Sequence, residues 1–315
     1  MPPLYHTRAL LLLTWLLPGL AAADELILPP VDVDLIGEIR YTEARYEDTL
    51  LDIARRHDLG RDEIVNANSG VDTWLPGEGT RIMLPTRYIL PDAPRQGLVL
   101  NLPEMRLYYY PPARRGEVRR MFTHPISIGR LDWKTPLGKT RISAKQKDPS
   151  WRPPKSILKE AAEDGRELPE VIPAGPDNPL GRYALRLAVP GYLIHSTNKP
   201  YGLGMRVSHG CIRMYPEDIE KLFSRVRVNN PVHIVDQPIK LGWLADTLFV
   251  EVHPPLEEDE ARLRDLLRST LELIHKERER RPFVLDGAAL KQAVEERLGI
   301  PVPISKSGTF GTSAE

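Results

Sequence analysis

Residues 208–214 read Ser-His-Gly-Cys-Ile-Arg-Met, and this stretch decides how the rest of the chain is interpreted. It contains Cys211, the single cysteine among 315 residues, which cannot form an intramolecular disulfide. Cys211 is therefore an inert buried residue, an intermolecular bridge or a reactive thiol. His195 ends the apolar run 192–195, and an imidazole is the usual group that converts a thiol into the nucleophilic thiolate. Gly210 allows a tight turn that aims backbone N–H groups at an oxyanion, so the residues favour catalysis.

The order of a histidine, a spacer and Ser-His-Gly-Cys resembles the L,D-transpeptidase (YkuD) family, which remodels peptidoglycan. The spacer here is residues 196–207, on the short side of the range for the family. Arg213 stands where many members carry asparagine, and the arginine form resembles the branch found in Gram-negative envelopes. Thr-Pro-Leu-Gly at 135–138, ahead of an expected strand, is a weaker mark of the same family.

The resemblance implies a catalytic role for four residues. Cys211 is the nucleophile, and His195 is the base that takes the thiol proton and then protonates the leaving amine. The backbone N–H groups of Gly210 and Cys211 hold the oxyanion of the tetrahedral intermediate. The carbonyl of Ser196, the residue after the histidine, steers the imidazole.

The other motif side chains have less direct roles. Ser208 and His209 are expected to support the loop, because a ring two residues from the cysteine on a turn suits hydrogen bonding better than proton transfer. Arg213 either meets a substrate carboxylate or forms a structural ion pair. A zinc site of His195, His209 and Cys211 is an alternative, but no Cys-x-x-Cys or His-Glu-x-x-His signature supports it. We therefore expect neither a metal nor a cofactor.

Three functions remain open at this stage. The first is a transpeptidase whose thiolate attacks the stem tetrapeptide amide before the terminal D-alanine and passes the acyl group from a thioester to an amine. That acceptor is a stem diaminopimelate or a lipoprotein lysine, and carbapenems are the expected inhibitors. The second is a hydrolase (an L,D-carboxypeptidase) of the same bond. The third is a non-catalytic wall-binding protein.

The N-terminus reads as an export signal. An apolar run at 9–17 follows His6 and Arg8, and small residues lead to Ala23, after which we expect cleavage. Residues 1–23 are thus a predicted signal peptide, and the mature protein is predicted to be periplasmic. A membrane anchor is the alternative, although the run is short for a bilayer.

Composition narrows the class of partner. Lys+Arg and Asp+Glu are balanced at 43 each, so the charge gives no indication of nucleic-acid binding. The 31 prolines favour a loop-rich, mainly β protein, and the length allows roughly two domains.

Residues 39–86 predict a short strand, two short helices and a second strand. This β-α-α-β order, with Asp-Thr-Leu at 48–50 and Leu-Pro-Gly at 75–77, resembles a LysM domain, which binds peptidoglycan glycan. A small packing domain without ligand affinity is the alternative. Residues 86–95 contain Pro91 and Pro94 and are predicted to be a linker.

Residues 95–236 carry the motif and the expected mixed β-sandwich of the family. An insertion at 144–180, with a helix from Lys155 to Asp164, is either a flap over the active site or a structural addition. Residues 240–315 are predicted to be a helical extension with helices at 256–281 and 287–298, ending in a disordered segment from residue 305.

Overall fold

The computed structural model describes residues 25–130, 132–256 and 260–306. The predicted signal peptide, and all but the first two residues of the predicted disordered segment, lie outside the described residues. No helix in the described ranges is both long and apolar enough to cross a membrane.

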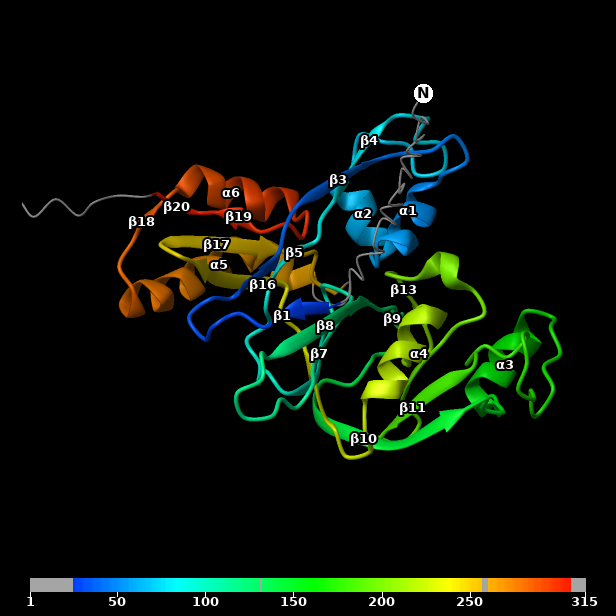
Figure 1. Ribbon diagram of the computed structural model, residues 1–315. Coiled ribbons are helices and arrows are strands. Elements are labelled where there is room, and N and C mark those ends of the chain that lie inside the picture. The colour runs from blue at the N-terminus through cyan, green and yellow to red at the C-terminus, as the bar shows by residue number, and fades with distance from the viewer. Residues whose placement is uncertain (1–24, 131, 257–259, 307–315) are drawn as a thin grey trace, which may run out of the picture.

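The protein is mainly β, as its sequence predicts, and is built on a nine-stranded mixed sheet (Figure 1). The apolar positions of the sheet enter two cores. The larger one also takes in Ile219 and Leu222 of α4 (Pro216–Arg225), and the smaller one holds Val99, Tyr108 and Met121. In spatial order the strands are β1 (Glu25–Ile27), β8 (Arg120–Pro125), β7 (Arg106–Tyr110), β6 (Gly97–Asn101), β15 (Pro231–Val235), β10 (Gly138–Lys147), β11 (Tyr183–Leu187), β12 (Leu193–His195) and β14 (Ile212–Arg213).

The end of this sheet carries the two residues that the sequence singles out. Strand β14 pairs parallel to β12, with Ile194 opposite Ile212. Both isoleucines are fully buried, so the core holds the two strands in register. A small parallel pair, β9 (Ile128–Gly129) and β13 (Arg206–Ser208), leads into the motif. The short helix η1 (Pro200–Gly202) lies in the spacer between β12 and β13.

The N-terminal module has the expected order, β3 (Arg40–Glu43), α1 (Leu50–Arg56), α2 (Arg61–Ala67) and β4 (Arg81–Leu84). Thr49 caps α1, because its hydroxyl accepts from the backbone N–H of Asp52 at 3.1 Å while Asp52 accepts from the N–H of Thr49 at 3.0 Å. Leu50, Ile53 and Ile64 are completely buried in a separate small core.

The prediction that residues 86–95 form a linker is wrong. Within it, β5 (Arg87–Ile89) pairs with β2 (Leu35–Gly37), and Ile89 and Leu90 are buried. The flanking prolines bound this strand and do not make the segment flexible, because its alternate side chains enter cores shared with the rest of the protein.

The C-terminal extension contains both expected helices, α5 (Glu260–Arg280) and α6 (Gly287–Glu296). It also contains a sheet that the sequence analysis did not include. This antiparallel sheet has three strands, in the order β16 (Ile239–Leu244), β17 (Thr247–Val252) and β19 (Val302–Pro303). A separate antiparallel pair is formed by β18 (Val284–Leu285) and β20 (Ser305–Lys306). Trp243 and Leu248 bury against Leu266 and Leu290 of the helices, so helices and sheet share one core.

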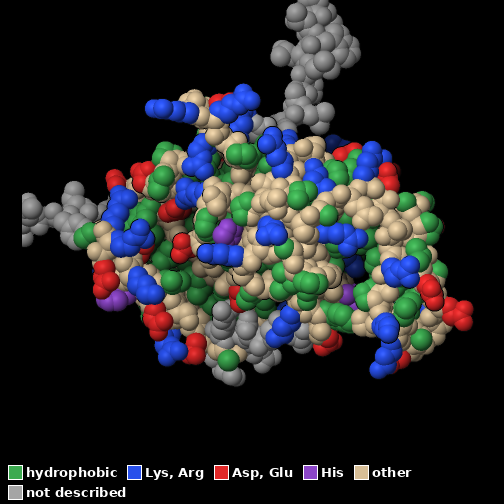
Figure 2. Space-filling model, turned by 90° about the horizontal axis from the view of Figure 1, so that it is seen from below, with side chains coloured by type: hydrophobic (Ala, Val, Ile, Leu, Met, Phe, Trp, Pro, Cys, Tyr) green, Lys and Arg blue, Asp and Glu red, His purple; other side chains and the backbone are tan. Residues whose placement is uncertain are grey.

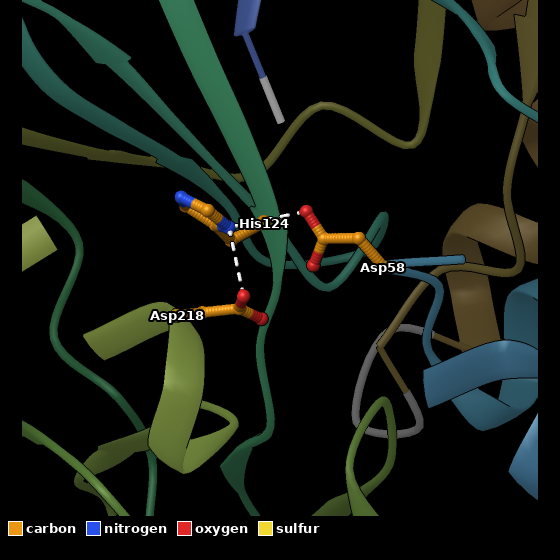
Figure 3. Close-up of side chains that lie close together, drawn as sticks. All are labelled: Asp58, His124 and Asp218. Atoms are coloured by element: carbon orange, nitrogen blue, oxygen red, sulfur yellow. Dashed lines mark hydrogen bonds and ion pairs between the residues drawn. The ribbon is translucent and has the colours of Figure 1, made fainter. Parts of the chain in front are cut away.

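The N-terminal module docks onto the nine-stranded sheet through the loop between α1 and α2. In Figure 3, Asp58 of this loop, His124 of β8 and Asp218 of α4 converge. The Nδ1 atom of His124 lies 3.1 Å from Asp58 and 3.6 Å from Asp218. The buried guanidinium of Arg106 binds both carboxylate oxygens of Glu63 at 2.8 and 2.9 Å. These contacts fix the module against the nine-stranded sheet and α4.

A second buried network holds the C-terminal module in place. The ammonium of Lys240 lies 2.9 Å from Glu104 and 2.7 Å from Glu251, and all three side chains are buried. Glu251 also accepts from His253 at 2.6 Å and from the backbone N–H of Ile89 at 2.6 Å. Because each buried charge has a partner, β5, β16 and β17 are held against the hairpin of β6 and β7, whose turn contains Glu104.

The surface charge is unevenly distributed although the whole chain is balanced. On the face seen from below, Lys and Arg side chains lie across the middle, and Asp and Glu side chains lie mostly toward the edges (Figure 2).

Candidate functional site

The motif forms a tight turn between β13 and β14. Gly210 has a φ of +93°, and a Cβ built on it would meet the ring of Tyr192 at 3.0 Å. A side chain at this position is therefore excluded by both backbone conformation and space. The hydroxyl of Thr135 donates to the carbonyl of Gly210 at 2.9 Å and accepts from the N–H of Gly129 at 3.1 Å. Ser208 donates through its hydroxyl to the carbonyl of Cys211, so hydrogen bonds hold both ends of the turn.

Cys211 is half-buried at the end of this turn. Its Sγ atom lies 3.6 Å from the carbonyl oxygen of Gly191, to which it donates. Burial raises the pKa of the Cys211 thiol, and the backbone N–H of Leu193 and the charge of Arg213 partly oppose this rise. The ground state at neutral pH is therefore a thiol, which needs a base to become a nucleophile.

His195 is buried, and its Nδ1 atom lies 2.5 Å from the carbonyl oxygen of Ser196. A carbonyl only accepts, so Nδ1 carries the proton and Nε2 keeps its lone pair. Burial, with a contribution from Arg213, lowers the pKa of His195 to about 3, although the bond to Ser196 opposes the change. The imidazole is thus neutral and able to take a proton.

The parallel register relates these two side chains. His195 lies opposite Arg213 in this pairing, and Cys211 directly precedes β14, so the two groups lie on neighbouring strands. No hydrogen bond joins His195 to Cys211 among the described residues, since Sγ faces the carbonyl of Gly191. The structure therefore places the two groups next to paired strands without a formed thiol–imidazole bond.

His209 is engaged elsewhere. Its Nε2 atom lies 2.7 Å from a carboxylate oxygen of Glu160, in helix α3 (Lys155–Glu163) of the insertion. The edge of the ring contacts Trp133, with centroids 5.2 Å apart. The geometry is that of a loop-supporting side chain, and it places the insertion helix beside the motif.

Arg213 is a partly buried cation. Burial lowers the pKa of its guanidinium. The described residues offer this side chain neither a hydrogen-bond acceptor nor an ion-pair partner, so the structural ion pair that the sequence left open is not formed there. A partly desolvated guanidinium favours an anionic ligand with matching planar geometry.

Comparisons with known proteins decide the family. The family model of the L,D-transpeptidase catalytic domain (YkuD) matches residues 95–234. The probable L,D-transpeptidase YcfS of Escherichia coli K12 is 37% identical over 295 residues, which cover 91% of this chain and 90% of YcfS. This chain belongs to the L,D-transpeptidase (YkuD) family.

Two further proteins are similar to this L,D-transpeptidase family member. The probable L,D-transpeptidase YbiS of E. coli K12 is 39% identical over 256 residues, which cover 80% of this chain and 82% of YbiS. The solved structure of the catalytic domain from the E. faecium L,D-transpeptidase is 21% identical, covers 46% of this chain and 100% of that domain, and has a TM-score of 0.34.

The zinc alternative gains no support from the donor geometry. Nδ1 of His195 and Nε2 of His209 both have protein partners. Among the described residues, the His, Cys, Asp and Glu groups that converge closely lie at the module junctions and do not include Cys211. In one of them the ammonium of Lys240 already supplies the cation.

Two residues beside the Ser-His-Gly-Cys motif were not predicted from the sequence. Glu160 binds His209 beside the motif, and Arg130 pairs with Glu160 at 2.5 Å. The only signal in the sequence was the length of the insertion, because neither residue belongs to a motif.

Proposed function

We propose that this chain is an exported peptidoglycan L,D-transpeptidase with Cys211 as nucleophile. The observation that carries the proposal is the neutral His195, with Nδ1 held by Ser196 and Nε2 available, on the strand that pairs with the one Cys211 precedes. The thiol, the base and a glycine turn are the parts that cysteine acyl transfer requires.

The reaction divides into two half-reactions, acylation and deacylation of Cys211, and each moves a proton onto His195 and off it again. His195 takes the thiol proton as sulfur attacks the carbonyl carbon before the terminal D-alanine. The C–N bond then breaks, the leaving amine takes that proton from His195, and a thioester remains on Cys211. An acceptor amine attacks the thioester and gives up a proton to His195, which restores the thiol. A stem diaminopimelate or a lipoprotein lysine would serve as this amine.

The turn supplies the oxyanion site in this proposal. The backbone N–H groups of Gly210 and Cys211 have no acceptor among the described residues, which leaves them available to the tetrahedral oxygen. Such preorganised donors act where charge develops in the transition state. Arg213 would bind a carboxylate of the stem peptide beside them.

The test is incubation of purified protein with tetrapeptide muropeptides, with and without an acceptor amine, followed by mass spectrometry. We expect a cross-linked product that requires the amine, and no product from Cys211→Ser, which keeps the shape but loses the thiolate. Release of D-alanine with water as the only acceptor would assign a hydrolase. No turnover at all would leave a wall-binding protein. A carbapenem should add its mass once to wild type and not to Cys211→Ala.

We also propose that the N-terminal module is a LysM-like glycan binder and that the protein acts in the periplasm. The β3-α1-α2-β4 order and the exposed side chains of Tyr46 and Trp74 support glycan binding, because aromatic rings stack on sugars. The predicted signal peptide, with cleavage after Ala23, supports export.

A further inference from the structure

A single carboxylate joins the insertion to the motif turn. Glu160 of α3 accepts from Nε2 of His209 at 2.7 Å through one oxygen and pairs with Arg130 at 2.5 Å through the other. Because a carboxylate only accepts, Nε2 of His209 must carry the proton in this bond. Three segments distant in sequence therefore meet at Glu160.

The segments that meet there also pack tightly against the turn. The N–H of Trp133 donates to the carbonyl of Arg130 at 2.9 Å, and the Trp133 ring contacts His209. A Cβ on Gly129 would lie 1.8 Å from the carbonyl oxygen of Trp133 and 3.0 Å from the Cα of Gly210. With so little space, a shift of the His209 ring is transmitted to Gly210 and Cys211.

We propose that Glu160 is a positioning residue that holds His209, and through it the Gly210–Cys211 turn, in the geometry that binds the oxyanion. This inference rests on the proposed function, since it concerns the acyl-transfer step. The insertion is then a working part of the active site, because its helix fixes the donors without touching the substrate.

The exposure of the pair separates this role from a stabilising one. The side chains of Arg130 and Glu160 are 37% and 30% exposed, and ion pairs with that exposure contribute little to stability. Bonds from Arg130 first, and from His209 second, lower the pKa of Glu160, so the carboxylate stays charged at neutral pH. Loss of Glu160 should therefore change the rate and leave the melting temperature almost unchanged.

The experiment compares two reactions of Cys211 in the full-length mature protein. Acylation by a carbapenem passes through an oxyanion, whereas alkylation by iodoacetamide needs the thiolate but no oxyanion site. Both are followed by mass spectrometry in wild type, Glu160→Ala and Glu160→Gln. Glu163→Ala is the matched control, because Glu163 lies on the same helix and, within the part of the chain that the structure describes, forms an ion pair with Lys159 alone, at 3.7 Å.

We expect Glu160→Ala to lower the acylation rate at saturating carbapenem about tenfold to a hundredfold, which is the effect of misplaced oxyanion donors. The carbapenem concentration that gives half of this rate should change little. Alkylation should change by less than about twofold. Glu160→Gln should recover part of the loss, because its amide oxygen still accepts from His209. Glu163→Ala should behave as wild type.

Four results would overturn the positioning role or what it rests on. If Glu160→Ala is acylated as fast as the wild type, the positioning role is excluded. If Glu160→Ala loses acylation and alkylation equally, Glu160 acts on the reactivity of the thiol or on folding, and not on the oxyanion site. If the alanine variant does not fold, an unchanged acylation rate in Glu160→Gln excludes it. Absence of any adduct on wild type would instead refute the proposed function.

Discussion

His195 and Cys211 form a neutral pair at neutral pH, because burial lowers the pKa of the imidazole to about 3 and raises the pKa of the thiol. Protonation of His195 begins only well below its ordinary pKa, so the base stays available through mildly acidic solution. We expect the rate of carbapenem acylation at subsaturating concentration to be flat from about pH 5 to about pH 8. A stopped-flow pH profile measures this, and an acid limb centred near the ordinary imidazole pKa would contradict it.

Arg213 has no ion-pair partner among the described residues although its guanidinium is partly buried, and this gives a prediction about substrate recognition. Wild type should turn over a muropeptide with a free terminal carboxylate at least about tenfold more efficiently than its terminal amide, in keeping with a charged hydrogen bond. Arg213→Ala should abolish that preference. Arg213→Lys should keep only part of it, because an ammonium cannot bind both carboxylate oxygens as the planar guanidinium does. Equal discrimination by the alanine variant would remove Arg213 from recognition.

At the element scale, the start of α2 meets the loop before the motif through two glycines. A Cβ on Gly204, whose φ is +83°, would lie 2.4 Å from the Cα of Gly60. We expect Gly204→Ala to lower the melting temperature by several degrees, because strain and backbone contact combine.

The matched control is Gly202→Ala, since a Cβ at Gly202 has nothing within 4 Å. Differential scanning calorimetry of both variants checks the prediction. Equal melting temperatures would show that the contact between Gly204 and Gly60 adjusts to the added methyl group without loss of stability.

At the scale of the whole molecule, the docking of the N-terminal module depends on buried charge. Glu63 binds the guanidinium of Arg106, whose side chain is 1% exposed. Glu63→Ala should destabilise the protein by about 3 kcal/mol or more, because it leaves a buried cation without its counterion. Glu47→Ala, at an exposed position of the same module, should have little effect. Chemical denaturation measures both, and similar midpoints would contradict the expected clamp.

The same docking changes how wall binding should be tested. Deletion of residues 39–86 would remove Glu63 and Asp58 together, so it would not leave the catalytic domain undisturbed. A surface change is cleaner. Trp74 is 64% exposed, and Trp74→Ala should weaken sedimentation with purified sacculi while leaving turnover of a soluble muropeptide unchanged. Unchanged sedimentation would argue against a glycan site at this residue.

The sequence by itself determined the family and many of the elements, because those depend on local pattern, but it did not predict β5 or the sheet of β16, β17 and β19. A single cysteine in Ser-His-Gly-Cys, the alternation of apolar residues and the Thr49 cap are all read from neighbours in the chain. It did not determine which segments meet. Glu160 reaches His209 across 49 residues, and Ile89 meets Lys240 across 151, so neither contact follows from composition or period. Only the packing of the modules decided them, since a buried charge selects its partner by what lies beside it in space.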